Sequence, residues 1–319
     1  MKTLEDFTNF YNTTLLSDLK VLEQERRKIT SRLIFILVAI LCTLGICLLI
    51  INSYTQEATP FVFILAILSL IIYAVIYYFT TRGYVARFKS LVIQRIVKFI
   101  DENLNYDARG CIDKTTFISS KIFTTKPNRY KGDDLVWGKT GATQIKFSEI
   151  KAEHESGSGK NRRRYTIFKG LFFIGDFNKH FSCETVVLPD TAEKLFGHFG
   201  QKLQSLNILR GQLVKLEDPE FENHFVVYGD DQIQARYILS TSLMERIVEF
   251  KKKTGRKIYL SFVGSMVFVA VSYTKSLFEP RIFRTLLDFE PIREYFEDLQ
   301  LAIGIVDDLN LNTRIWSKQ

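Results

Sequence analysis

Two stretches of the chain are apolar throughout and carry no charge. Residues 33–51 read LIFILVAILCTLGICLLII, and residues 61–79 read FVFILAILSLIIYAVIYYF. As a helix, each run would span roughly 28 Å, close to the ~30 Å hydrocarbon core of a bilayer. The polar residues 52–60 between them allow only a short connection between antiparallel neighbours. We therefore predict a transmembrane hairpin over residues 33–79, with an external loop at 52–60.

The cations around these runs predict an orientation. They lie outside the hairpin on both sides, and the loop at 52–60 has none: Lys20, Arg26, Arg27, Lys28 and Arg32 precede it, and Arg82, Arg87 and Lys89 follow it. Lysine and arginine gather on the cytoplasmic side of membrane helices. Both termini are therefore expected in the cytoplasm.

Amphipathic helices are predicted on either side of the hairpin. Residues 1–32 repeat apolar side chains at three- and four-residue steps, at Phe7, Tyr11, Leu15, Leu19 and Leu22. Such a stripe is buried against a partner surface, which we expect to belong to the same chain. Residues 80–109 are predicted to be a helical stalk, with Phe88, Val92, Ile96 and Ile100 on one face.

The pattern over residues 110–319 predicts a cytoplasmic, mainly antiparallel α+β domain. Strands are expected on both sides of a turn at 139–141, over 165–174, over 183–189 and in short segments at 212–217 and 225–228. Residues 258–273 are predicted to form a hairpin with Gly264-Ser265 as its loop. Hairpins outnumber any β-α-β pattern, which favours antiparallel pairing.

Capping residues predict where the helices of this domain begin and end. Helices are expected to start at Asp190 and at Ser242, each with an acid three residues later, and Gly255 is expected to end the second. A turn is expected at Asp218-Pro219. Two further helices are expected near Pro280 and Pro291, and the last buries Ile292, Phe296, Leu299, Ile303 and Val306.

The stretch HESGSGKNRRRY, residues 154–165, contains the Gly-Lys core of a phosphate-binding loop. The motif fails, because its first glycine would fall at His154 and Asn161 stands where a hydroxyl is needed. A strand, not a helix, is expected after it. We predict a hairpin tip whose cations are either solvated or contact anionic lipid or an acidic partner: Lys160, Arg162, Arg163 and Arg164.

Other chemistry-bearing residues are dispersed. The four histidines are scattered, and the spacing of His180 and Cys183 is not matched by a second ligand pair. The acid pairs at 133–134, 230–231 and 307–308 are expected at element ends, as caps or turns. Four unclustered cysteines argue against a disulfide framework. We predict no catalytic, cofactor-binding or metal-binding residues and no nucleotide or nucleic-acid partner.

Four segments together resemble a known family: residues 130–154, 168–181, 213–247 and 309–316. With the two apolar runs before them, they are similar to the bacterial membrane-protein family catalogued as domain of unknown function 3137, over about residues 80–319. The resemblance implies a protein of the bacterial cytoplasmic membrane and implies no catalytic residues. In its most distinctive part, GDDQIQARYIL, we expect Asp230 or Asp231 to cap a helix and Arg236 to pair with an acid.

The sequence favours a membrane-anchored cytoplasmic scaffold or binding module, because it contains no complete catalytic motif. It would act through anionic lipid or through an unidentified protein partner, and self-association is an open alternative for the apolar stripe. Two other readings stay open: a membrane-anchored enzyme whose site is assembled from dispersed residues, and an accessory subunit of a transporter.

Overall fold

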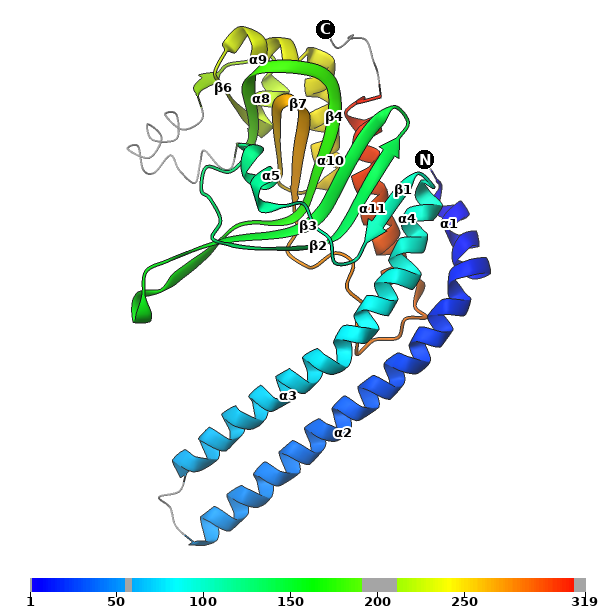
Figure 1. The fold of residues 1–319 in the computed structure, drawn as a ribbon, viewed down its shortest axis with the longest axis vertical. Helices are drawn as coiled ribbons and strands as arrows, with labels where there is room; N and C mark the ends of the chain where they lie inside the picture. Colours follow the sequence, from blue (N-terminus) through cyan, green and yellow to red (C-terminus); the bar gives the residue numbers. More distant parts are fainter. Residues whose placement is uncertain (1, 55–58, 191–210, 313–319) are drawn as a thin grey trace. The chain divides into compact units, whose positions relative to one another are not determined.

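The computed structural model describes residues 2–54, 59–190 and 211–312, and the chain divides into two compact units. The helical unit comprises Lys2–Arg95 with Phe278–Tyr295. The sheet unit comprises Ile96–Leu277 with the residues from Phe296 onward. The fold is a mixed α+β fold with an antiparallel sheet and two long apolar helices, as predicted (Figure 1).

Two long helical rods lie side by side in the helical unit (Figure 1). The first consists of α1 (Leu4–Phe10), a π-helical turn (Tyr11–Leu15) and α2 (Leu16–Tyr54). The second consists of α3 (Thr59–Phe88), a π-helical turn (Lys89–Ile93) and α4 (Gln94–Ile100), whose last residues belong to the sheet unit. The helices extend into the predicted loop at both ends, and residues 55–58 of that loop lie outside the described residues.

The apolar runs inside these rods are exposed. Stretches within Leu4–Ile50 and Phe63–Ile100 are long and apolar enough to cross a membrane, judged by length and composition. Phe35 and Leu49 of the first run are 75% and 72% exposed, and Leu70 of the second is 71% exposed. The predicted stripe behaves differently, because Phe7, Leu15 and its other members are all buried.

That stripe packs within the same chain, as predicted. The Tyr11 ring meets Phe289 edge-on at a centroid distance of 4.9 Å, and the Tyr11 hydroxyl donates to the carbonyl of Leu287 at 3.1 Å. Residues 278–288, although close to the C-terminal end of the sequence, therefore pack against the N-terminal helices. We call this segment the strap. Its course corrects the helix predicted at Pro280, because residues 274–288 are not helical.

The sheet unit carries strands in the order β1-β2-β3-β4-β6-β5, and β7 pairs with β4; every pairing is antiparallel. Their bounds are Leu104–Asp107 (β1), Arg129–Thr140 (β2), Thr143–Ser156 (β3), Arg163–Pro189 (β4), Gln212–Val214 (β5), Phe225–Gly229 (β6) and Ile258–Ser272 (β7). The turn at Gly141 between β2 and β3 confirms the predicted pair of strands.

Two predictions for the strands are wrong. The strands expected at 165–174 and 183–189 are parts of one strand, β4, which arches over at two register shifts (Figure 1). The hairpin predicted over 258–273 is one strand, Ile258–Ser272. Gly264 has φ +62°, yet both halves of β7 pair with β4. The two halves of β7 follow the arch of β4, so the chain does bend at Gly264. The halves pair with β4, however, and not with each other as predicted.

Helices complete the sheet unit: three short ones, α5 (Lys114–Ser119), α8 (Pro219–His224) and α9 (Gln232–Ile238), and two longer ones, α10 (Thr241–Thr254) and α11 (Phe289–Asp308). The first turns of α11 belong to the helical unit. Asp218-Pro219 starts helix α8 and is not a plain turn. Ser240, not Ser242, caps α10, and Gly255 ends it in the left-handed conformation as predicted. The helix expected from Asp190 falls on 191–210, outside the described residues.

An aromatic core holds one face of the sheet. Phe117 of α5 lies 5.1 Å from Phe172 of β4 between ring centroids, and both are buried. The predicted apolar face of α11 is confirmed, since Ile292, Phe296 and Val306 are each at most 1% exposed.

The sheet also carries the β3–β4 hairpin, which extends away from the rest of the sheet (Figure 1).

Candidate functional site

The predicted hairpin tip is present between β3 and β4. The strands pair up to Ser156 and Arg163, and one 3-10 turn at Gly159–Asn161 connects them. Gly157 has φ +84°, and a side chain there would fall 2.4 Å from the carbonyl oxygen of Asn161. Glycine is therefore required for the turn, so these glycines serve the hairpin and not a phosphate loop.

One carboxylate organises the arginines of this tip. Glu155 accepts from Arg129 at 2.7 Å and from Arg164 at 3.2 Å, and it also pairs with Arg162. Its side chain is only 10% exposed, while those three arginine side chains are 44–63% exposed. The hydrogen bond from Arg129 is the main reason why the pKa of Glu155 lies below its usual value.

The arginines therefore form an ordered cationic surface, which we call the basic tip: Arg129, Arg162, Arg163 and Arg164. A single carboxylate cannot use all the donors of three guanidinium groups, since each carries five N–H bonds. Arg163 is exposed and, among the described residues, has no ion pair. Lys160 belongs to the same turn, but its side chain lies outside what the structure describes.

Sequence reasoning missed Arg129 and Glu155. Arg129 is opposite Glu153 in the β2–β3 pair and reaches Glu155 two residues further along β3, whereas Glu155 is opposite Arg164 in the β3–β4 pair. The turn at residue 141 does not by itself predict the β2–β3 pairing here, because a register shift between Asp133 and Val136 displaces it by one residue. Opposite charges at facing positions stabilise a hairpin modestly, so the carboxylate also supports the arm.

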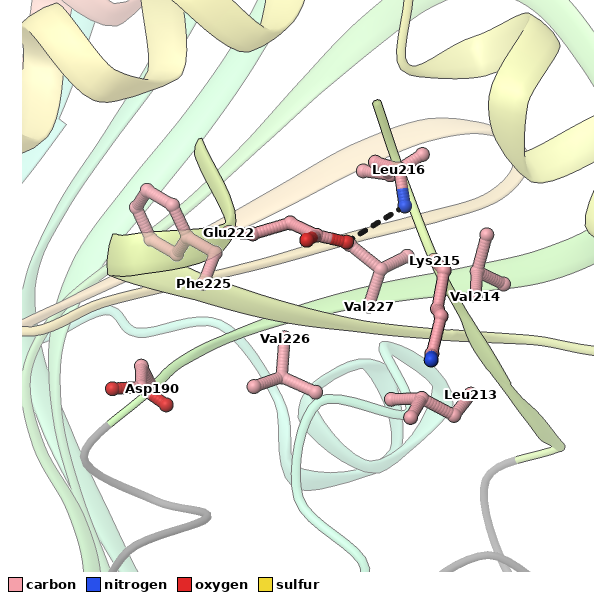
Figure 2. A pocket seen from close by; sticks show the side chains of 9 residues that line it. All are labelled: Asp190, Leu213, Val214, Lys215, Leu216, Glu222, Phe225, Val226 and Val227. Atoms are coloured by element: carbon pink, nitrogen blue, oxygen red, sulfur yellow. Dashed lines mark hydrogen bonds between the residues drawn. The ribbon is translucent and has the colours of Figure 1, made fainter. Parts of the chain in front are cut away.

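A pocket of about 240 Å³ lies beside β5 and β6. Its lining is mixed: Asp190, Leu213, Val214, Lys215, Leu216, Glu222, Phe225, Val226 and Val227. Figure 2 shows Glu222 directed at the backbone N–H of Leu216, which donates to it at 2.9 Å. This acid therefore holds the loop after β5. The pocket is smaller than the usual 300–1,000 Å³ of a ligand site, and its lining residues form no nucleophile–base pair.

The distinctive GDDQIQARYIL segment is structural. Asp231 caps α9 by accepting from the backbone N–H groups of Ile233 and Gln234 at 2.7 and 3.2 Å, as expected. Arg236 donates to the carbonyl of Lys215 at 3.2 Å, so its expected acidic partner is replaced by backbone. The Gln234 side chain accepts from the backbone N–H of Cys183 at 2.6 Å and fastens the arch of β4.

The acid pairs have three different settings. Asp231 is a cap, and Asp308 at the end of α11 pairs with Lys253 of α10 at 2.7 Å. The prediction that Asp134 lies at the end of an element is wrong. It lies inside β2 at a register shift, where it is fully buried and has φ +58°. The hydroxyl of Tyr106 donates to it.

A buried charged cluster fastens the strap inside the helical unit. Glu23 accepts from Arg26 at 2.8 Å through both oxygens and from the backbone N–H of Leu286 at 3.0 Å. Arg26 in turn donates to the carbonyl of Ile282 at 2.8 Å. Hydrogen bonding from Arg26 lowers the pKa of Glu23 from 4.5 to about 2. We call this cluster the clasp, because Glu23 and Arg26 of α2 together hold Leu286 and Ile282 of the strap.

Comparisons with known proteins give a family match over part of the chain. No curated protein matches the chain. The crystal structure of the mycobacterial trehalose monomycolate transport factor A, TtfA, is similar at 8% identity with a TM-score of 0.31, covering 66% of this chain and 95% of that one. A likeness at this level supports no inference about fold or function. Residues 166–311, however, match the family described as "Protein of unknown function (DUF3137)". This match confirms the predicted resemblance to domain of unknown function 3137 over residues 166–311.

Proposed function

We propose that this protein is a membrane-anchored binding module whose basic tip contacts anionic lipid on the cytoplasmic face of the membrane. The two apolar runs, 33–51 and 61–79, would cross the bilayer, with both termini in the cytoplasm. The observation that carries the proposal is the gathering of three arginines on Glu155, which orders cations at the end of an extended arm.

The charge on the arm supports this reading. Residues 151–165 hold five cations and two acids, and Arg129 adds a further cation from β2. Each cation that reaches an anionic leaflet contributes about 1 kcal/mol of attraction. Tethering by the membrane helices makes the encounter intramolecular, so weak individual contacts suffice.

The exposed apolar runs support membrane insertion. Large side chains such as Phe35, Leu49 and Leu70 are more than 70% exposed along both runs, which water would disfavour. Hydrocarbon is the solvent that suits such a surface. The flanking cations then set the orientation.

The orientation is tested by cysteine labelling in intact spheroplasts. A Ser53→Cys variant should react with a membrane-impermeant thiol reagent, and a Ser317→Cys variant should react only after lysis. The native cysteines at 42, 47, 111 and 183 are first replaced by serine. Labelling of residue 317 in intact spheroplasts would refute the topology.

The basic tip is tested on the full chain in nanodiscs. An environment-sensitive fluorophore on Ser158→Cys should report a less polar surrounding on anionic nanodiscs than on zwitterionic ones. Salt should weaken the response, because the Debye length is only ~10 Å at 0.1 M. Replacing the four residues of the basic tip, Arg129, Arg162, Arg163 and Arg164, by serine should abolish it.

A matched control removes the same charge elsewhere on the sheet unit: Arg109, Lys114, Lys139 and Lys257, all changed to serine and all exposed. This variant should respond like the parent. An equal loss in both fourfold variants would mean that net charge, not the basic tip, governs the contact. An unchanged response in the basic-tip variant would leave its cations as a solvated turn.

A further inference from the structure

The strap is fixed to both membrane-directed helices at one level. On α2, the Thr30 hydroxyl and Arg26 both donate to the carbonyl of Ile282, at 3.1 and 2.8 Å. On α3, the ring of Tyr77 stacks on Phe283 with 6.3 Å between centroids and 18° between planes. All of these residues belong to the helical unit.

These contacts place the strap relative to the apolar runs. Thr30 lies three residues before Leu33, where the first run begins, or about 4.5 Å along a helix. Tyr77 lies two residues inside the end of the second run at Phe79, or about 3 Å. Two independent contacts therefore put residues 282–283 at the boundary where both apolar runs meet polar sequence.

The strap presents interfacial chemistry at this boundary. Ile282 is buried at 6%, whereas Phe283 is 58% exposed between the exposed residues Arg281 and Arg284. Arg281 is paired with Glu294 at 3.2 Å. The Arg284 guanidinium has no ion pair with any other residue that the structure describes. An aromatic ring beside an unpaired guanidinium suits the zone between acyl chains and phosphates.

Other exposed aromatic side chains lie at the same end of the second run. Tyr78 and Phe79 on α3 are 56% and 68% exposed, and their rings meet edge-on at 5.4 Å. A single exposed phenylalanine is ordinary on a soluble surface. Phe283, in contrast, stacks on Tyr77 at the end of an apolar run where Tyr78 and Phe79 are exposed as well. Aromatic side chains of this kind are typical of the interface between a bilayer and water.

We propose that residues 281–284 form a lipid-binding wedge at the membrane interface. Phe283 inserts beside Tyr77 at the level of the first acyl carbons, and Arg284 binds the phosphate of an anionic phospholipid. A guanidinium suits this role because its planar donors bind phosphate oxygens in pairs. The wedge rests on the proposed membrane insertion of α2 and α3, and it is separate from the basic tip.

Quenching by brominated lipid tests the wedge in the full chain, reconstituted in nanodiscs. Trp137 and Trp316 are replaced by phenylalanine, and one tryptophan is introduced at a time. Phe283→Trp should be quenched strongly by phosphatidylglycerol brominated near the headgroup. Leu287→Trp is the matched control: it lies on the same strap with 37% exposure, but its carbonyl is held by Tyr11, far from the apolar run. It should be quenched weakly.

A third tryptophan separates this proposal from the insertion of the helices. Leu70→Trp lies in the middle of the second run and should be quenched by lipid brominated deep in the acyl chain. If Leu70→Trp is quenched and Phe283→Trp is not, the wedge is overturned and membrane anchoring stands. If Leu70→Trp is not quenched either, the proposed anchoring itself fails.

Lipid selectivity tests Arg284. In the Phe283→Trp protein, brominated phosphatidylglycerol should compete better than brominated phosphatidylcholine by about fivefold, as expected for one cation at a charged leaflet. Arg284→Gln should remove this preference without reducing quenching by phosphatidylcholine. Arg293→Gln, which removes a guanidinium that pairs with Glu290 in the same unit, should preserve it. Equal selectivity in the parent and in Arg284→Gln would overturn the assignment of Arg284.

Discussion

The clasp on the strap makes a quantitative prediction for Glu23→Gln. The Glu23 side chain is 4% exposed, and its two oxygens accept from Arg26 and from the backbone N–H of Leu286. Glutamine keeps the shape but replaces one accepting oxygen by an N–H₂ group. It also leaves Arg26, itself 8% exposed, without its counter-ion.

The shifted pKa gives the size of the loss. A fall from 4.5 to about 2, at about 1.4 kcal/mol per unit, corresponds to about 3 kcal/mol of stabilisation at neutral pH. Removing one partner of a buried ion pair costs a similar amount, about 3–5 kcal/mol. Because the folded-state pKa is depressed, this stabilisation is present above pH 4.5 and is lost as the pH falls through about 2.

Hydrogen exchange measured by mass spectrometry reports on the clasp directly. At neutral pH, the amide of Leu286 should exchange about a hundredfold faster in Glu23→Gln than in the parent, the factor that corresponds to about 3 kcal/mol. Glu25→Gln is the control, because Glu25 pairs with Arg87 at the surface, where such pairs contribute about 0–1 kcal/mol. Similar acceleration in both variants would refute the assignment of Glu23 as the clasp.

Two further predictions concern the sheet unit. Gly170→Ala should lower its stability by at least about 3 kcal/mol, because φ is +149° and the new Cβ would lie 2.1 Å from the carbonyl oxygen of Val271. Gly264→Ala, at φ +62° with open space around it, should cost about 1 kcal/mol, and thermal unfolding followed by Trp137 fluorescence compares the two. Asn312→Ala should cost about 1–2 kcal/mol, since its side-chain oxygen accepts from the backbone N–H of Ala142 at 2.9 Å. Faster exchange of the Ala142 amide would confirm it, and an unchanged rate would contradict it.

Local signals in the sequence predicted much of the fold. The left-handed Gly255, the β2–β3 turn at Gly141 and the buried face of α11 all depend on residues close together in the chain. The apolar periodicity of the N-terminal stripe likewise predicted burial within the chain. Such features need only a preferred dihedral angle or a helical repeat, and both can be read from neighbouring residues.

Features that depend on distant partners were not predictable in the same way. Residues 258–273 have the composition and glycine of a hairpin, but β4 offers both halves of β7 a longer ladder. Pro280 is typical of a helix start. In the structure, however, the carbonyl of Ile282 accepts a hydrogen bond from Arg26, 256 residues earlier in the chain, and not from a following turn of helix. At the basic tip, Arg162, Arg163 and Arg164 were predicted from the sequence, but the contribution of Arg129 and the role of Glu155 depended on strand register.

The strap also has a consequence for biosynthesis. The helical unit needs residues 278–295, which are made only after the whole stretch from Ile96 to Leu277 has been synthesised. At about 5–20 residues per second, this delay is roughly 10–35 s. During that interval, the apolar stripe that ends in Leu22 lacks the aromatic ring of Phe289 that later packs on Tyr11. The nascent chain therefore passes through a period in which α1 and α2 are complete but the residues that later cover their apolar stripe have not yet been made.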